Sequence, residues 1–329
     1  METRFANFIR FYPGRLAMPI GVYAGLEITG ATVRSAVSDA NAQSEAVLAL
    51  HDRFHTPVML TAMDLSAEAE TFGCAIRMSD EEIPTVVGRR ATSLEEIQAL
   101  PEPRPGDLRT AVHLDTARCL VSQGGRIPVL GGMIGPISLA GRIFGVSEML
   151  ELTITDPETA LLLLEKVAHF LTAYAEAFRE AGAWGVIMAE PAAGLLSPRA
   201  MGRFSSPFVR QVVDAVQTEE FAILLHNCGA KLVHLPYVLQ SGAGILHFGA
   251  PMNITAALGQ VDPGVILCGN LDPTAVFLQG TPGQVAQQTA ELLAAAEGRA
   301  NFVISSGCDL PPGTPVENLQ AFYDSVNSE

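Results

Sequence analysis

Short apolar runs recur along the chain, and longer segments with helical or loop character separate them. Most of the runs are continuous rather than alternating, which is typical of parallel strands buried on both faces. Eight runs are expected to be strands: Ile20–Ala24, Pro57–Thr61, Pro128–Gly132, Val186–Glu190, Ala222–His226, Gly244–Phe248, Val265–Cys268 and Phe302–Ser305. Strands that alternate with helices in this number predict an α/β fold, a single (β/α)₈ TIM barrel.

Helices with clear start signals follow several of these strands. Asp156-Pro157-Glu158 places a capping residue before a first-turn proline, and the apolar positions that follow keep one helical face to about Ala181. Further helices are expected from Ser197 to about Val216 and from Thr281 to about Glu297. The last helix begins near Thr314, which is placed for a capping box.

The stretch Arg77–Gly106 interrupts this alternation. It is charged, contains few apolar residues and ends in a proline-rich segment, Pro101–Pro105. We interpret it as a surface excursion over one face of the barrel, either a functional loop or a plain insertion. The expected organisation is therefore one catalytic domain over residues 1–329, with an excursion at about 77–106.

Composition and charge exclude several classes of protein. The chain has 329 residues, 48% of them hydrophobic, and a net charge of −15, so it has no basic surface for a nucleic-acid backbone. No apolar run is long enough to span a membrane, and the first ten residues lack a signal-peptide core. Five widely spaced cysteines argue against a disulfide framework, so we expect a cytoplasmic protein.

Three side chains suggest a metal site. His226 and Cys228 end one apolar run, and Cys308 follows a similar run 80 residues later. Side chains two residues apart on a strand point the same way, so His226 and Cys228 can bind one ion from the same side. One imidazole and two thiolates suit Zn²⁺, and three protein ligands leave its fourth position open for chemistry.

Other polar residues also stand at the carboxyl ends of expected strands, where barrels carry their active sites. We predict Glu190 and Asp64 as catalytic groups, with Glu190 also a candidate fourth zinc ligand, and Asn270 and His247 as cofactor-binding residues. Structural roles remain open for some of them. Asp64 could equally cap a helix that begins at Leu65, and Asn270 and its neighbour Asp272 could cap the helix after their strand.

Several motifs together resemble one family. They are Gly135-Pro136, His226-Asn227-Cys228-Gly229, Gly269-Asn270-Leu271-Asp272-Pro273 and Ser305-Ser306-Gly307-Cys308-Asp309. This set resembles the zinc-dependent corrinoid methyltransferases of the uroporphyrinogen decarboxylase superfamily, which include corrinoid:coenzyme M methyltransferases and the methyltransferases of O-demethylase systems. The resemblance is specific from about residue 128 to the end and thin before it. It implies a barrel of the uroporphyrinogen decarboxylase type with zinc on His226, Cys228 and Cys308.

The resemblance also implies a reaction. A methyl group would move between a small substrate and the cobalamin of a separate corrinoid protein, because this chain has no Asp-x-His-x-x-Gly cobalamin-binding motif. The substrate is either a methyl ether donor, such as a phenyl methyl ether, or a thiol acceptor, such as coenzyme M. The thin N-terminal resemblance slightly favours an O-demethylase-type donor, or a substrate outside these two classes, over coenzyme M. A homodimer is compatible with an acidic barrel of this size, although no surface pattern indicates one.

Two other classes of protein remain open. One is a uroporphyrinogen decarboxylase-like lyase, although the segment Ala17–Gly25 has no arginine where decarboxylases carry an arginine-rich motif for substrate carboxylates. The other is a non-catalytic barrel in which zinc is a structural clip. His247 is a departure from the methyltransferases, because related sequences more often carry a serine and an aspartate there.

Overall fold

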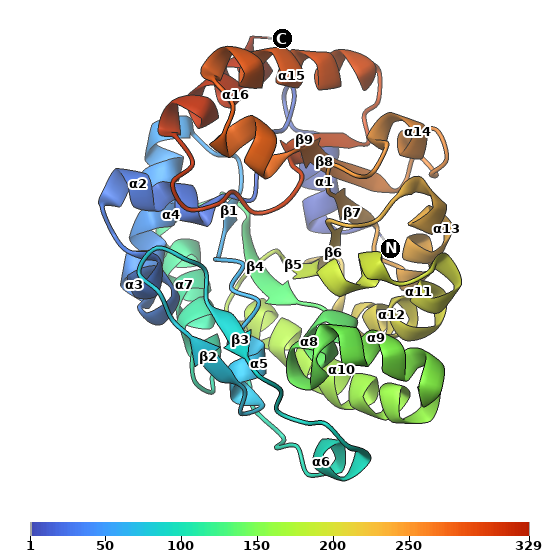
Figure 1. The fold of residues 1–329 in the computed structure, drawn as a ribbon. Helices are drawn as coiled ribbons and strands as arrows, with labels where there is room; N and C mark the ends of the chain where they lie inside the picture. The colour runs from blue at the N-terminus through green and yellow to red at the C-terminus, as the bar shows by residue number, and fades with distance from the viewer. Residues whose placement is uncertain (1, 329) are drawn as a thin grey trace.

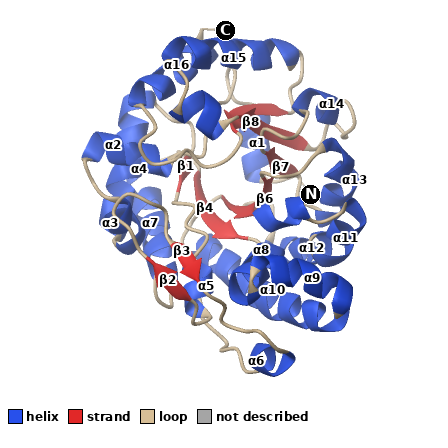
Figure 2. Ribbon diagram, in the orientation of Figure 1, coloured by secondary structure: helices blue, strands red, loops and turns tan. Residues whose placement is uncertain are grey.

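A curled sheet of seven parallel strands forms the centre of the computed structural model, which describes residues 2–328 (Figure 1). The strands are ordered β1-β4-β5-β6-β7-β8-β9, and the helices lie outside them (Figure 2). Their bounds are β1 (Met59–Leu60), β4 (Val129–Ile134), β5 (Gly185–Ala189), β6 (Ala222–Asn227), β7 (Ile245–Phe248), β8 (Ile266–Leu271) and β9 (Phe302–Ser306). The predicted α/β barrel architecture is confirmed, and seven of the eight expected strands are found.

An extended segment rather than a full strand occupies the eighth position of the barrel. Ala17 forms a single parallel bridge with Ile304 of β9, and the Met18 N–H donates to the Ile304 carbonyl at 2.9 Å. The chain then turns into a 3₁₀ helix, η1 (Val22–Gly25), so the strand expected at Ile20–Ala24 is wrong. Among the strand pairings of residues 2–328, none joins this segment to β1, and the sheet is open at this seam.

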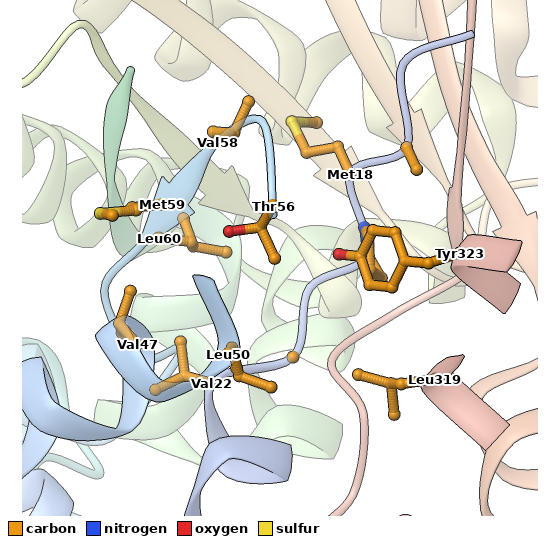
Figure 3. A pocket seen from close by; sticks show the side chains of 13 residues that line it. Met18, Val22, Val47, Leu50, Thr56, Val58, Met59, Leu60, Leu319 and Tyr323 are labelled. Carbon is orange, nitrogen blue, oxygen red and sulfur yellow. The ribbon is translucent and has the colours of Figure 1, made fainter. Parts of the chain in front are cut away.

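Apolar side chains pack across the open seam. Figure 3 shows Met18 and Tyr323 facing Leu60 across a crevice of about 40 Å³. A single water needs about 10–15 Å³ of such space, so the crevice has room for a few waters at most. The crevice is therefore a gap in packing between the two edges of the sheet and is too small for a substrate.

The outer helices follow the sequence signals in part. Asp156 caps α10 (Pro157–Glu180) by accepting a hydrogen bond from the Thr159 N–H, and the apolar face of this helix is buried. The helix expected from Ser197 to Val216 is divided in two near Pro207, which has no N–H to continue the hydrogen-bond ladder. Thr314 does not form the predicted capping box, because its hydroxyl donates to the Pro311 carbonyl instead.

The helices before β5 are α1 (Arg4–Arg10), α2 (Leu26–Thr29), α3 (Val33–Ser38), α4 (Ala40–Phe54), α5 (Ala67–Thr71), α6 (Leu94–Gln98), α7 (Thr110–Gln123), α8 (Pro136–Phe144), α9 (Val146–Thr155) and α10. Those after β5 are α11 (Pro198–Phe204), α12 (Ser206–Val216), α13 (Leu235–Val238), α14 (Ile254–Leu258), α15 (Pro282–Ala295) and α16 (Val316–Asn327). None of the helices within residues 2–328 combines the length and apolar character needed to cross a membrane.

The excursion between β1 and β4 contains an antiparallel hairpin. β2 (Ala75–Arg77) pairs with β3 (Thr85–Val87), and α6 follows, projecting from the rest of the molecule in Figure 1. The hairpin brings Ile83–Thr85 to the wall of the cavity that also contains His226. The excursion therefore contributes to the candidate site, while the assignment of the chain to a single domain stays a prediction.

Candidate metal centre

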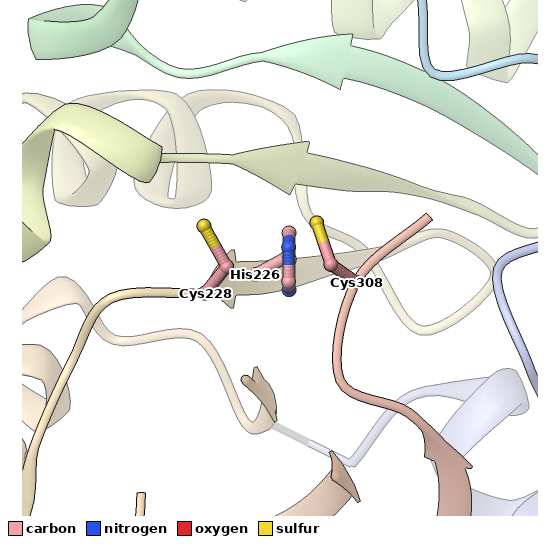
Figure 4. A group of neighbouring side chains, drawn as sticks. All are labelled: His226, Cys228 and Cys308. Carbon is pink, nitrogen blue, oxygen red and sulfur yellow. The ribbon is translucent and has the colours of Figure 1, made fainter. Parts of the chain in front are cut away.

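His226, Cys228 and Cys308 lie together at the mouth of the barrel. The nitrogen and sulfur atoms that they could offer to a metal ion all lie within 4.8 Å of one another. Figure 4 shows the imidazole of His226 between the two cysteines. The sequence predicted this grouping from two segments far apart in the chain, and their role as zinc ligands stays a prediction.

Two parallel strands position the three residues, and two glycines let the backbone segments beside them pack closely. His226 is on β6 and Cys228 follows its end, while Cys308 follows β9 by two residues. A Cβ atom on Gly249 would lie 2.2 Å from the Cys228 carbonyl oxygen, and one on Gly307 would lie 2.9 Å from the Ala250 nitrogen. Glycine at both positions lets the two cysteine-bearing loops approach the β7 loop closely.

His226 presents one ring nitrogen that has no protein partner. Its Nδ1 lies 2.8 Å from Nδ1 of His247, whereas its Nε2 is buried and has no hydrogen-bond partner within residues 2–328. Buried polar atoms are almost always paired, so an unpaired imidazole nitrogen beside two thiols needs an explanation. A bound metal ion supplies one, because an N,S₂ donor set suits Zn²⁺.

The two thiols share one electrostatic environment. The hydrogen bond from Cys308 lowers the pKa of Cys228, and His226 adds to this effect. The same contact with Cys228, together with burial, raises the pKa of Cys308. Burial also lowers the pKa of His247, which keeps this ring neutral beside His226. The site therefore favours one thiolate and a neutral His247 even without an ion.

A cavity of about 320 Å³ opens beside this group. Its apolar wall consists of Met63, Leu65, Ile83 and Pro84. Arg142 and Asp309 also line it, and both carboxylate oxygens of Asp309 are buried without a hydrogen-bond partner. Burial raises the pKa of Asp309 well above its usual range. The cavity can therefore hold a small molecule in contact with the His226, Cys228 and Cys308 group.

Glu190 lies next to His226 in the sheet but faces a helix. Its Oε1 accepts from the Ile137 N–H at 3.0 Å, and its Oε2 accepts from the Ser138 N–H at 3.0 Å and the Ser138 hydroxyl at 2.6 Å. These donors are at the N-terminus of α8, where a carboxylate is favourable. Burial raises the pKa of Glu190 to about 7. Glu190 is fully buried and does not line the cavity, so its catalytic and zinc-binding roles stay predictions.

Asp64 is held by a buried ion pair. Its carboxylate pairs with Arg109 and accepts from the Ser66 N–H at 3.0 Å and the Ser66 hydroxyl at 2.6 Å. Arg109 also donates to Glu70 at 2.7 Å. α5 begins at Ala67 with Ser66 before it, and no side chain caps it, so the alternative that Asp64 caps a helix beginning at Leu65 is wrong. A catalytic role for Asp64 stays a prediction that its present contacts do not require.

Asn270 and Asp272 both use their side chains to hold backbone. The Asn270 amide donates to the carbonyls of Gly249 at 2.9 Å and Met252 at 2.7 Å, and so fixes the loop after β7. Asp272 caps the short helix Pro273–Leu278, as the structural interpretation expected. Cofactor binding by Asn270 stays a prediction. His247 is fully buried, does not line the cavity and contacts His226 and Ser305.

Sequence reasoning missed three residues of the site. Arg142 is on α8, and nothing in its local sequence distinguishes it from a surface arginine. Ser305 is in an apolar run, where serine usually fills space. Asp309 directly follows Cys308, so its position beside a candidate ligand was the one available signal.

Comparisons with known proteins show what the whole chain is similar to. The sequence profile of the family described as Uroporphyrinogen decarboxylase (URO-D) matches residues 15–329, so the resemblance extends well before residue 128. The methylcobamide:CoM methyltransferase MtbA of Methanosarcina mazei is 30% identical over 94% of this chain and 90% of its own length. A methylated-thiol–coenzyme M methyltransferase of the same organism is 28% identical over 79% of this chain and 69% of its own length.

A solved structure described as a methyltransferase from Methanosarcina mazei superimposes with a TM-score of 0.87 at 21% identity. The match covers 100% of this chain and 99% of that one, which shows that the whole fold is shared. The family profile over residues 15–329 shows that the chain belongs to the uroporphyrinogen decarboxylase (URO-D) family.

Proposed function

We propose that the protein is a zinc-dependent methyltransferase that transfers a methyl group from the cobalamin of a separate corrinoid protein to a small thiol. The carrying observation is the group of three ligand atoms within 4.8 Å, with His226 Nε2 unpaired, on the wall of a substrate-sized cavity. The methyltransferase relatives support an enzyme of corrinoid-linked methyl transfer. Zinc, the partner and the substrate are parts of the proposal.

His226, Cys228 and Cys308 would hold the ion and leave one position for the substrate. Bound zinc lowers the pKa of a coordinated thiol, so that a substrate thiolate exists at neutral pH. The corrinoid protein would supply the methyl group, and a substrate thiolate held at His226, Cys228 and Cys308 would accept it, with the electron pair of the broken cobalt–carbon bond left on the corrinoid. The thiol proton is released to solvent. Met63 and Leu65 line the same cavity and would give the bound substrate an apolar surrounding.

Arg142 favours a thiol with an anionic group over a neutral methyl ether. It lines the cavity, and its guanidinium has no hydrogen-bond or ion-pair partner among the described residues. A partly buried cation without a partner is costly, and an anionic group of the substrate would offset that cost. The N-terminal sequence slightly favoured an ether donor. The surroundings of Arg142, together with thiol-methylating relatives, support methyl transfer from cobalamin to a thiol instead.

A decarboxylase activity fits the cavity less well. Several substrate carboxylates need several guanidinium groups, and Arg142 is the one arginine that lines this cavity within residues 2–328. The metal-ligand group would also have no purpose in that reaction. Homodimer formation and a cytoplasmic location stay predictions.

Methyl transfer from methylcobalamin to a small anionic thiol tests the proposal. Absorbance would report loss of methylcobalamin, and mass spectrometry would identify the thioether. Replacing a ligand in Cys228→Ala should lower the rate at least about 100-fold, because zinc contributes several kcal/mol to such reactions. Cys268→Ala is the matched control, because Cys268 is equally a free cysteine but is fully buried outside the group. Equal rates in the two variants would contradict the proposal.

A further inference from the structure

A chain of three hydrogen bonds connects His226 to the N-terminal segment. Nδ1 of His226 lies 2.8 Å from Nδ1 of His247, and Nε2 of His247 lies 2.8 Å from the Ser305 hydroxyl oxygen. The Ser305 hydroxyl donates to the Met18 carbonyl at 2.6 Å. All three side chains are almost completely buried, so water does not compete for these contacts.

Counting protons along this chain fixes the direction of each bond. A carbonyl only accepts, so the single Ser305 proton points to Met18 and its oxygen must accept from Nε2–H of His247. The two Nδ1 atoms that face each other at 2.8 Å share one proton, and a His226 that binds an ion through Nε2 carries that proton on its own Nδ1, so Nδ1 of His247 accepts it. His226 is left with a bare Nε2, the atom that has no protein partner and lies beside the two thiols.

We infer that His247 and Ser305 are positioning residues that hold His226 in the tautomer required to bind the metal through Nε2. This inference rests on the proposed function, because it takes the three-residue group to be a zinc site. Metal-binding histidines usually donate their other ring N–H to a carboxylate, a carbonyl or water. Here a second histidine and a serine connect the ligand to a backbone carbonyl.

The barrel geometry explains why these residues meet. His226 and His247 are paired neighbours on β6 and β7, and their rings pack edge to face with centroids 4.7 Å apart. Ser305 is on β9, two strands from β7, and alternate strands of a barrel contribute side chains to one interior layer. Met18 is in the segment beside β9, so the eighth barrel position completes the support of the metal ligand.

Zinc affinity of the purified protein, measured by competition with a chromophoric chelator, tests the inference without an activity assay. Ser305→Ala removes the acceptor for His247 and should weaken zinc binding about 10-fold or more, in the range known for residues that support metal ligands. The matched control is Ser306→Ala. Ser306 is equally buried on the same strand, but its hydroxyl accepts from the Ile20 N–H and is not part of the chain.

Two His247 variants separate hydrogen bonding from packing. His247→Phe keeps a ring but loses both bonds and should weaken zinc binding at least as much as Ser305→Ala. His247→Gln can still accept from His226 and donate to Ser305, so it should retain most of the affinity. Melting temperatures of all four variants would show whether a loss of affinity merely follows a loss of stability.

Nitrogen-15 spectra of histidine-labelled, zinc-free protein provide a second readout. The inference predicts Nδ1–H for His226 and Nε2–H for His247, with the His226 proton moving to a mixture of both nitrogens in Ser305→Ala. Zinc affinity within twofold of the wild type in both Ser305→Ala and His247→Phe would overturn the inference while leaving the proposed function intact. Absence of zinc binding by the wild-type chain would overturn both.

Discussion

Arg142 places a guanidinium on the wall of the cavity that contains His226, Cys228 and Cys308. The rest of this wall is largely apolar, so one polar contact can determine which end of a substrate faces the metal site. An anionic group on Arg142 and a sulfur at the three ligands would fix a short substrate at both ends. If the proposed function holds, substrate choice depends at the residue scale on the positive charge of Arg142.

Arg142→Gln should raise the KM for an anionic thiol about 10- to 100-fold and change kcat little, because a hydrogen bond to a charged group contributes about 1.5–3 kcal/mol. A neutral thiol of the same length should be affected far less. Steady-state rates with both thiols would measure the effect. Arg118→Gln, on the exposed face of α7, is the control. An equal loss with both thiols would show that Arg142 supports the fold rather than the substrate.

At the scale of elements, α5 is tied to β4 through one buried carboxyl group. Glu68 Oε1 accepts from the Ile134 N–H at 2.8 Å, while its Oε2 is buried with no partner. Burial raises the pKa of Glu68 to about 8. Because this pKa is higher in the folded state than in the unfolded chain, protonated Glu68 favours folding at low pH. That contribution is lost as pH rises through the folded pKa.

Glu68→Gln should therefore flatten the pH dependence of stability between its unfolded and folded pKa values. In the wild type this one group contributes a slope of about 1.4 kcal/mol per pH unit in that window, and glutamine does not ionise. Urea unfolding at pH 5.5 and pH 7.5 would measure it, with Glu45→Gln on the exposed side of α4 as the control. If the free energy of unfolding changes equally with pH in the wild type and in Glu68→Gln, the raised pKa of Glu68 is contradicted.

The elements also show what the sequence could predict. Continuous apolar runs identified β9 to within one residue, because both faces of a parallel strand are buried. The same pattern was misleading at Ile20–Ala24, which is buried as a 3₁₀ turn and not as a strand. The grouping of His226, Cys228 and Cys308 was predictable because His226 lies on β6, Cys228 directly follows that strand and Cys308 follows β9 by two residues. Arg142 and Ser305 were not, because their roles depend on contacts between distant segments.

At the scale of the whole molecule, the barrel brings together groups from across the chain. The excursion, α8, β6 and the segments after β6 and β9 all contribute to the cavity wall. The residues are Ile83 and Thr85, Arg142, His226, Cys228 and Cys308, in chain order. The N-terminal segment completes the eighth position and accepts the last hydrogen bond of the chain that begins at His226. The open seam beside it is closed by apolar packing, so the fold tolerates the missing strand pairing.

X-ray absorption at the zinc edge, with and without a small thiol, tests the central claim most directly. The resting protein should show two sulfur neighbours at about 2.3 Å and one nitrogen at about 2.0–2.1 Å, with lighter atoms completing the shell. Adding the thiol should raise the sulfur count from two to three. A sulfur count that stays at two with saturating thiol, or protein that retains no zinc on His226, Cys228 and Cys308, would contradict the account.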